Sequence, residues 1–61
     1  MNAPTTGPDL REEREALGVK IIAVAAAMGV SRNTITRLES RPAVSPGKAR
    51  RYLRALAEAQ S

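Results

Sequence analysis

The side chains best equipped for specific recognition lie in one short segment, residues 32–39. Its outer face, opposite the apolar Ile35 and Leu38, carries two guanidinium groups, a carboxamide and a hydroxyl, from Arg32, Asn33, Thr36 and Arg37. A guanidinium donates two parallel hydrogen bonds, and a carboxamide donates one beside one that it accepts, so both types fit the edges of nucleic-acid bases. The plain alternative is the polar face of a solvated helix, which uses the same residue types.

The rest of the composition excludes most kinds of active site. The chain of 61 residues contains no cysteine and no histidine, which removes thiolate nucleophiles, imidazole bases, disulfides and the usual zinc ligands. A chain of this length forms one small domain that buries only about 60% of its unfolded surface, so a deep cleft is not expected. We therefore expect no enzymatic activity, no metal and no cofactor.

Charge is distributed unevenly along the chain. Residues 1–19 hold two basic and four acidic side chains, a net charge of −2, whereas residues 20–61 hold eight basic and two acidic ones, a net charge of +6. A basic region of this size suits a polyanion, and nucleic acid is the leading partner. A basic surface that only favours solubility explains the charge equally well.

The first part of the chain predicts a tail and one helix. Residues 1–8 contain two prolines and one glycine but little to bury, which predicts a flexible tail. Asp9 and an acidic residue three positions later have the spacing of a capping box at a helix start. Leu10 and Leu17 share one face of this helix, and Gly18 can supply the left-handed conformation that ends it.

Three further helices are predicted from the period of the apolar residues. The second covers about residues 20–27, and the third, residues 32–39, follows the N-cap residue Ser31. The fourth is capped by Ser45, and its inner face should contain Ala49, Tyr52, Leu53, Leu56 and Ala57. The predicted class is all-α, a compact bundle of four or five short helices that spans residues 9–58.

No segment of the chain predicts insertion into a membrane. No apolar run approaches the roughly 20 residues of a membrane span, and the start, MNAPTTGP, has neither the basic cluster nor the apolar stretch of a secretion signal. We therefore expect a cytoplasmic protein, or a nuclear one in a eukaryote.

The order of residue types over residues 21–38 has a steric logic beyond that of a generic helical pair. Ala25 allows two helices to approach closely, and Gly29 allows a sharp turn between them. This segment resembles the Cro-type, lambda-repressor-like family, also called the xenobiotic-response-element family. The resemblance covers residues 9 to about 57, and Met28 to Glu39 is similar to the turn and recognition helix of the family almost position for position.

The resemblance implies a helix-turn-helix fold and a function. It implies a regulator of transcription that binds double-stranded DNA sequence-specifically through the major groove. The short chain suggests a small homodimeric repressor of the phage or plasmid kind, bacterial or phage-encoded, that reads a palindromic operator.

The resemblance also implies roles for single residues. The residues expected to read bases are Arg32, Asn33, Thr36 and Arg37. The residues expected to contact phosphates are Lys20, Ser31, Thr34, Ser40 and Arg41, although an ordinary polar loop explains the last two equally well. Structural roles fall to Arg14, Ala25, Gly29, Ile35 and Glu39, and Arg14 is expected to pair with Glu39 between the first and third helices.

Two features depart from the family pattern. Family members often begin the second helix with a glutamine that contacts a phosphate, whereas this chain has Ile21, and Lys20 is the nearest replacement. Family members commonly dimerise through a fifth helix or a further domain, and this sequence ends after the fourth helix. A weak dimer interface is therefore expected at Val44, Leu56 and Ala57, formed fully only on DNA.

Other functions fit parts of the pattern. The strongest is a protein-interaction module, an antitoxin-like protein or an adaptor for a polymerase or a phage protein; a weaker one is a membrane-active peptide driven by the fourth helix. Tyr52 is expected in the core, most basic residues of the fourth helix are expected to be solvated, and one of the adjacent Ile21 and Ile22 is expected to be exposed. No small-molecule effector is evident.

Overall fold

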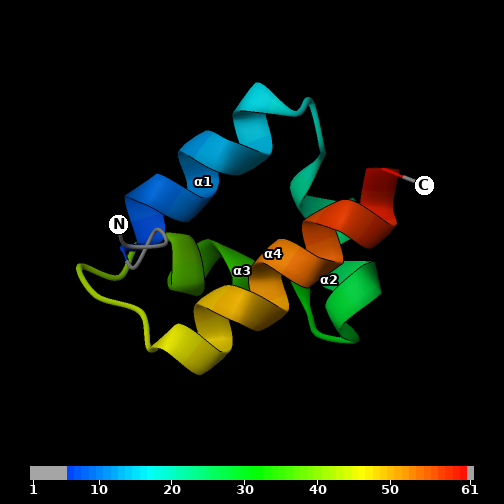
Figure 1. The fold of residues 1–61 in the computed structure, drawn as a ribbon. Helices are drawn as coiled ribbons and strands as arrows, with labels where there is room; N and C mark the ends of the chain where they lie inside the picture. The colour runs from blue at the N-terminus through cyan, green and yellow to red at the C-terminus, as the bar shows by residue number, and fades with distance from the viewer. Residues whose placement is uncertain (1–5, 61) are drawn as a thin grey trace.

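Four α-helices build the described part of the chain, residues 6–60 of a computed structural model (Figure 1). They are α1 (Gly7–Ala16), α2 (Ile21–Met28), α3 (Arg32–Glu39) and α4 (Pro46–Gln60). The all-α prediction is confirmed, with four helices and no strand in this range. Residues 1–5, most of the predicted tail, lie outside the described residues.

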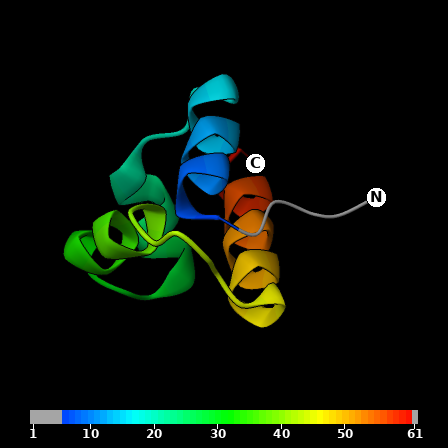
Figure 2. The ribbon, with the colours of Figure 1, turned by 90° about the vertical axis from the view of Figure 1, so that its left-hand side faces the viewer.

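α2 lies between α3 and α4 and packs against both of them. In Figure 2, α1 and α4 stand together on one side of the molecule, and α2 and α3 lie on the other. α4 packs against both α1 and α2, whereas α3 packs against α2 and α1. The longest helix therefore supports α2 and α1, and one face of α3 stays open.

α1 begins earlier than predicted. Its N-cap is Thr6, whose side-chain oxygen accepts a hydrogen bond of 3.2 Å from the backbone N–H of Asp9. Gly7 and Pro8, expected in the tail, form the first turn, where a proline loses no helical hydrogen bond. Asp9 is thus a first-turn residue, and the predicted cap was three residues late. The backbone N–H of Gly7 also donates to the carbonyl of Arg41 at 2.8 Å.

Two glycines end helices as predicted. Gly18 follows α1 with φ of 70°, and Gly29 follows α2 with φ of 71°, both in the left-handed region that other residues resist. The N–H of Val30 then reaches back to the carbonyl of Ala25 at 3.0 Å, which closes the end of α2. This turn directs the chain into α3.

The core lies where all four helices meet. The side chains that are fully or almost fully buried are Leu10, Val24, Ile35, Tyr52 and Leu56. Leu17, predicted on the same face as Leu10, is instead 44% exposed, because it lies at the C-cap of α1, where the helical period ends. Val19, just after the turn, is buried in its place.

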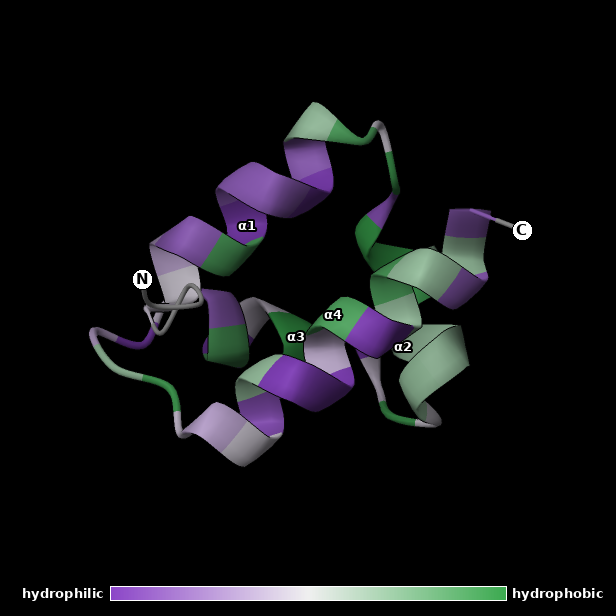
Figure 3. Cartoon of the chain, viewed as in Figure 1, coloured by the Kyte–Doolittle hydropathy of each residue, from purple (hydrophilic) through white to green (hydrophobic). Residues whose placement is uncertain are grey.

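Hydropathy follows this packing (Figure 3). α1 is mainly hydrophilic, whereas α2 is apolar over its whole length, and its two buried residues are Val24 and Ala25. On α4, Ala57 is exposed although it was predicted on the inner face, and Ala55 is buried there instead. Each residue advances about 100° around a helix, so residue 55 stays beside Tyr52 and residue 57 leaves that face. No helix in residues 6–60 combines the length and apolarity that crossing a bilayer needs.

Candidate nucleic-acid interface

α3 is anchored by one face and open on the other. Ile35 is fully buried and Leu38 is 7% exposed, so both side chains dock the helix onto the core. The four residues expected to read bases are all exposed: Arg32, Asn33, Thr36 and Arg37. A helix docked by a narrow apolar stripe presents its polar face at a fixed angle, as insertion into a groove requires.

Ser31 caps this helix as predicted. Its hydroxyl oxygen accepts a hydrogen bond of 3.3 Å from the N–H of Thr34, and the two hydroxyls lie 3.0 Å apart. The other N–H groups of the first turn have no partner inside the helix and carry its positive dipole end. Both Ser31 and Thr34 are exposed, so the start of α3 offers hydroxyls and amides to an anion.

Two hydroxyls on the outer side of α3 are already engaged. Thr36 Oγ1 donates to the carbonyl of Arg32 at 3.2 Å, and Ser40 Oγ donates to the carbonyl of Thr36 at 2.9 Å. A hydroxyl has one hydrogen, so it cannot also donate to DNA while that bond lasts. The methyl group of Thr36 stays free for an apolar contact, so Thr36 remains an expected base-reading residue through that group. Ser40 can donate to a phosphate only by exchanging its bond to the helix.

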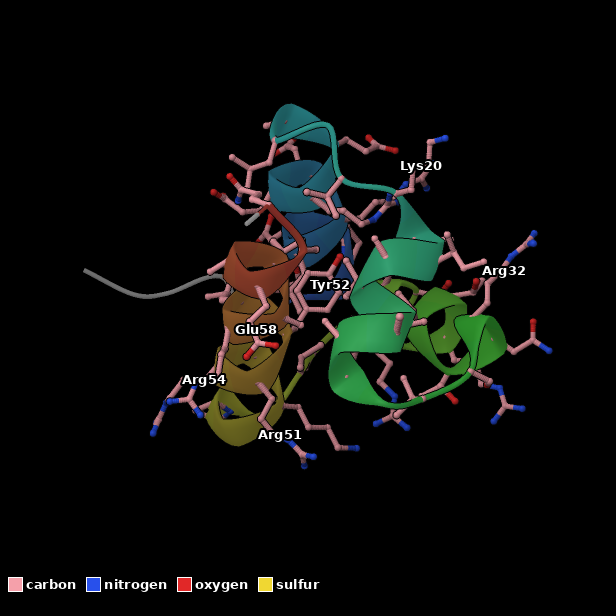
Figure 4. The ribbon with its side chains drawn as sticks, turned by 90° about the vertical axis from the view of Figure 1, so that its right-hand side faces the viewer. Lys20, Arg32, Arg51, Tyr52, Arg54 and Glu58 are labelled. Carbon is pink, nitrogen blue, oxygen red and sulfur yellow. The ribbon has the colours of Figure 1, made fainter. Side chains whose placement is uncertain are left out.

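The start of α2 explains the departure from the family pattern. Ile21 is half-buried and packs against the core, whereas its neighbour Ile22 is 62% exposed, as expected of one of the two. Lys20 is the N-cap residue of α2 but makes no side-chain capping bond, and its side chain is exposed. Figure 4 shows Lys20 and Arg32 on the same side of the molecule. Lys20 therefore stays the predicted phosphate contact of this helix.

The predicted ion pair between α1 and α3 is present and nearly buried. Arg14 Nε lies 2.8 Å from Glu39 Oε2, and its Nη2 lies 3.3 Å from Oε1, a two-point contact between side chains that are 12% and 5% exposed. Arg14 Nη1 also donates to the carbonyl of Val19 at 2.9 Å. The hydroxyl of Tyr52 donates to the same carboxylate from α4. Glu39 thus joins three helices at one buried point.

Sequence reasoning placed Tyr52 in the core correctly but missed its hydrogen bond. The signal was available, because a buried tyrosine hydroxyl usually needs a partner. Burial raises the pKa of Tyr52 above its ordinary value of 10, and the hydrogen bond to Glu39 raises it further. That carboxylate also raises the pKa of Arg14 by hydrogen bonding to its guanidinium. Both donors therefore keep their protons around neutral pH.

The hydroxyl of Tyr52 is expected to resist titration while the protein is folded. A phenol whose pKa is raised by folding stabilises the native state fully below about pH 10 and loses that contribution as the pH rises through the folded pKa. The protein has a single tyrosine and no tryptophan, so tyrosinate absorbance reports this side chain alone. In denaturant it should ionise near pH 10, and in the native protein only at higher pH, together with unfolding. Ionisation near pH 10 with helicity intact would contradict the bond to Glu39.

Two of the three residues predicted for the dimer interface are buried inside the single chain. Val44 is 5% exposed and Leu56 is 2% exposed, because both side chains belong to the core of a single chain. Neither is available to a partner, and of the three predicted residues only Ala57 is exposed. The large apolar side chains exposed within residues 6–60 are instead Leu17 and Ile22.

Two basic residues of α4 lie beside α3. Lys48 and Arg51 border the same hollow as Arg37 and Arg41. The sequence pattern missed this, because it left most basic residues of α4 to solvent without separating its two sides. Arg54 is not part of this hollow, and Figure 4 shows it pointing away from the α2–α3 side of the molecule.

Comparison with known proteins supports the motif. A helix-turn-helix family model matches residues 10–58, which include all of α2 and α3 and most of α1 and α4. No curated protein and no solved structure matches the chain. The matched range contains the capped, half-exposed α3, the sharp turn at Gly29 and the pair that ties α1 to α3. The chain therefore belongs to the helix-turn-helix family of DNA-binding domains, of the Cro and lambda-repressor type.

Proposed function

We propose that the protein is a small transcriptional repressor that binds double-stranded DNA sequence-specifically and acts in the cytoplasm of a bacterium, encoded there or by a phage. α3 enters the major groove, and a bound protein blocks access of the polymerase to the promoter. The observation that carries this proposal is the outer face of α3, where Arg32, Asn33 and Arg37 are exposed on a helix that Ile35 fixes to the core.

The binding site is proposed to be an inverted repeat bound by two copies. One reading helix of eight residues covers only a short stretch of base pairs. Two such helices in successive major grooves, about 34 Å apart, contact twice as many base pairs. Because Val44 and Leu56 are buried in one chain, the contact between the copies is small and forms on DNA. Tight dimers at nanomolar concentration without DNA would contradict this weak contact.

Selection of bound sequences from a random DNA pool tests the proposal directly. A repressor of this kind enriches one motif with two symmetric halves, and the spacing of the halves gives the distance between the two reading helices. Enrichment of a single half-site would contradict binding as a dimer but would still support sequence-specific binding. No enrichment, with binding to all sequences alike, would remove sequence-specific recognition from the proposal.

Arg32→Ala is expected to weaken binding to the selected site by about 1 to 3 kcal/mol and to relax the preference at one base pair. The loss follows from a bidentate contact between the guanidinium and a guanine, which alanine cannot make. Fluorescence anisotropy with a panel of single-base variants of the site measures it. Arg54→Ala removes an equal charge from a side chain that points away from the α2–α3 side and should leave the preference unchanged. Uniform weakening by Arg32→Ala across the panel would assign Arg32 to a phosphate.

Lys20→Ala is expected to change the salt dependence of binding rather than its sequence preference. Each neutralised phosphate releases counterions, so losing one contact should flatten the slope of log K against log salt by about one unit. Lys20→Arg keeps the charge and should keep the slope. An unchanged slope in Lys20→Ala, measured over the same salt range, would remove Lys20 from the interface.

A further inference from the structure

A hollow with a volume of about 230 Å³ opens between α3 and the first half of α4. Its floor is apolar: Leu38 is buried, and Met28, the last residue of α2, and Val30, in the turn after it, are half-buried. Thr34 adds one hydroxyl at its edge. Concave apolar surface with a few polar groups is the usual form of a small-molecule site.

The rim of this hollow is strongly positive. Arg37, Arg41, Lys48 and Arg51 all line it, and all four are exposed. The ion pairs found within residues 6–60 join Arg11 to Glu15 and Arg14 to Glu39, so no carboxylate of this range neutralises the rim. Four like charges around one hollow repel one another, and an anion bound among them relieves that repulsion.

We propose that this hollow binds a small organic anion, one carboxylate or phosphate on an apolar body about the size of a single ring, and that the anion displaces DNA. The rim binds the charge, and the floor covers the apolar body. The volume is below the roughly 300 Å³ at which pockets for drug-sized ligands begin, which limits the body to about one ring.

Displacement of DNA follows from shared residues and rests on the proposed function. Arg37 is an expected base-reading residue and Arg41 an expected phosphate contact, and both line the hollow. An anion between them uses donors and positive charge that DNA also needs, so each ligand weakens the other. Such a site is not predictable from local sequence patterns, because its lining comes from the end of α2, the turn after it, α3, the loop that follows α3, and α4.

Benzoate is the probe, because it has one ring and one carboxylate that is ionised at neutral pH. Titrations at constant ionic strength, followed by methyl resonances, should show saturable shifts at Met28, Val30 and Leu38. Benzyl alcohol has the ring without the charge, and inorganic phosphate has charge without the ring. Each should bind about tenfold more weakly than benzoate or worse, since each loses one of the two contributions.

Variants separate the site from a general ionic effect. Lys48→Gln and Arg51→Gln should each weaken benzoate binding about tenfold, because each removes a charged donor from the rim. Val30→Thr keeps the shape of the floor but makes it polar, and should weaken benzoate without changing phosphate. Arg54→Gln removes the same charge outside the hollow and should have no effect. An equal loss in Arg54→Gln and Arg51→Gln would overturn the proposal.

DNA binding of the same samples distinguishes this inference from the proposed function. If the wild-type protein binds its selected DNA and benzoate lowers that affinity at constant ionic strength, the inference is supported. If the protein binds DNA while benzoate gives no saturable shifts, the inference fails and the proposed function stands. If Lys48→Gln and Arg51→Gln weaken DNA and flatten its salt dependence without benzoate binding, the hollow seats the DNA backbone, and the inference also fails. If no DNA binds at all, the proposed function fails, and benzoate titration still tests the site.

Discussion

Gly7→Ala is expected to lower the free energy of unfolding by about 3 kcal/mol, because the added methyl group meets backbone that cannot move aside. A Cβ at this position would lie 2.4 Å from the carbonyl oxygen of Leu38 and 2.6 Å from the carbonyl carbon of Glu39. A domain of this length has a total stability of roughly 3 to 9 kcal/mol. Thermal unfolding followed by circular dichroism should show a loss of more than about 10 °C, since 1 kcal/mol shifts such a domain by about 4 to 8 °C.

Gly47→Ala is the matched control for this variant. Gly47 also lies in the first turn of a helix, α4, but a Cβ there would meet no atom within 4 Å. Alanine favours a helix over glycine by roughly 0.5 to 1 kcal/mol, so Gly47→Ala should be neutral or slightly stabilising. Alanine also favours a helix at position 7. There, however, the clash of its methyl group with the backbone of α3 has to outweigh this gain.

If Gly7→Ala leaves the free energy of unfolding unchanged, the first turn of α1 detaches from α3 at little cost. The turn is held by the bond from the N–H of Gly7 to the carbonyl of Arg41, in the loop that follows α3. If the turn does contribute as expected, Gly7→Ala should also loosen this loop. Hydrogen exchange of the amides over residues 40–45 would then be faster than in Gly47→Ala, measured at the same temperature.

The parts of the fold that follow local rules were predictable from the sequence. α3 begins at Arg32 and ends at Glu39 as predicted, because the signals for both ends lie within a few residues of it. Ser31 is a strong capping residue, and the spacing of Ile35 and Leu38 defines one docking face. The exposed face that we expect to read bases is the other side of the same pattern, so its placement followed once the helix was placed.

Contacts between distant segments were less predictable. Gly7 appeared to belong to a tail, because nothing near it in sequence shows that the carbonyls of Leu38 and Glu39 lie against it. The tyrosine bond to Glu39 depends on how α4 lies across α1 and α3, which periodicity does not give. Of the contacts between distant segments, the resemblance to the family predicted only the ion pair of Arg14 and Glu39.

The dimer prediction failed at two residues for a related reason. Val44 and Leu56 are apolar residues in positions that a short chain can use either for its own core or for a partner. With only four short helices, the core takes both, because a small domain has few apolar side chains to bury. Their apolar character was correctly identified, but the partner that they contact is the same chain.

Arg14→Met is expected to cost about 3 kcal/mol of stability, because it leaves the carboxylate of Glu39 buried without a counterion. Glu39 is 5% exposed, and it would keep only the hydroxyl of Tyr52 as a donor. The variant also removes the bond to the carbonyl of Val19, which secures the turn between α1 and α2. Urea unfolding, compared at equal m-values, measures the loss.

Arg11→Met is the control, because it breaks the exposed pair with Glu15, whose side chains are 61% and 54% exposed, on the same helix. That pair should contribute less than about 1 kcal/mol. Glu39→Gln added to Arg14→Met removes the uncompensated charge and keeps an acceptor for Tyr52, so the double variant should recover part of the loss. If Arg14→Met is as mild as Arg11→Met and the second change brings no recovery, the pair is solvated, and apolar packing alone sets the angle at which α3 faces its partner.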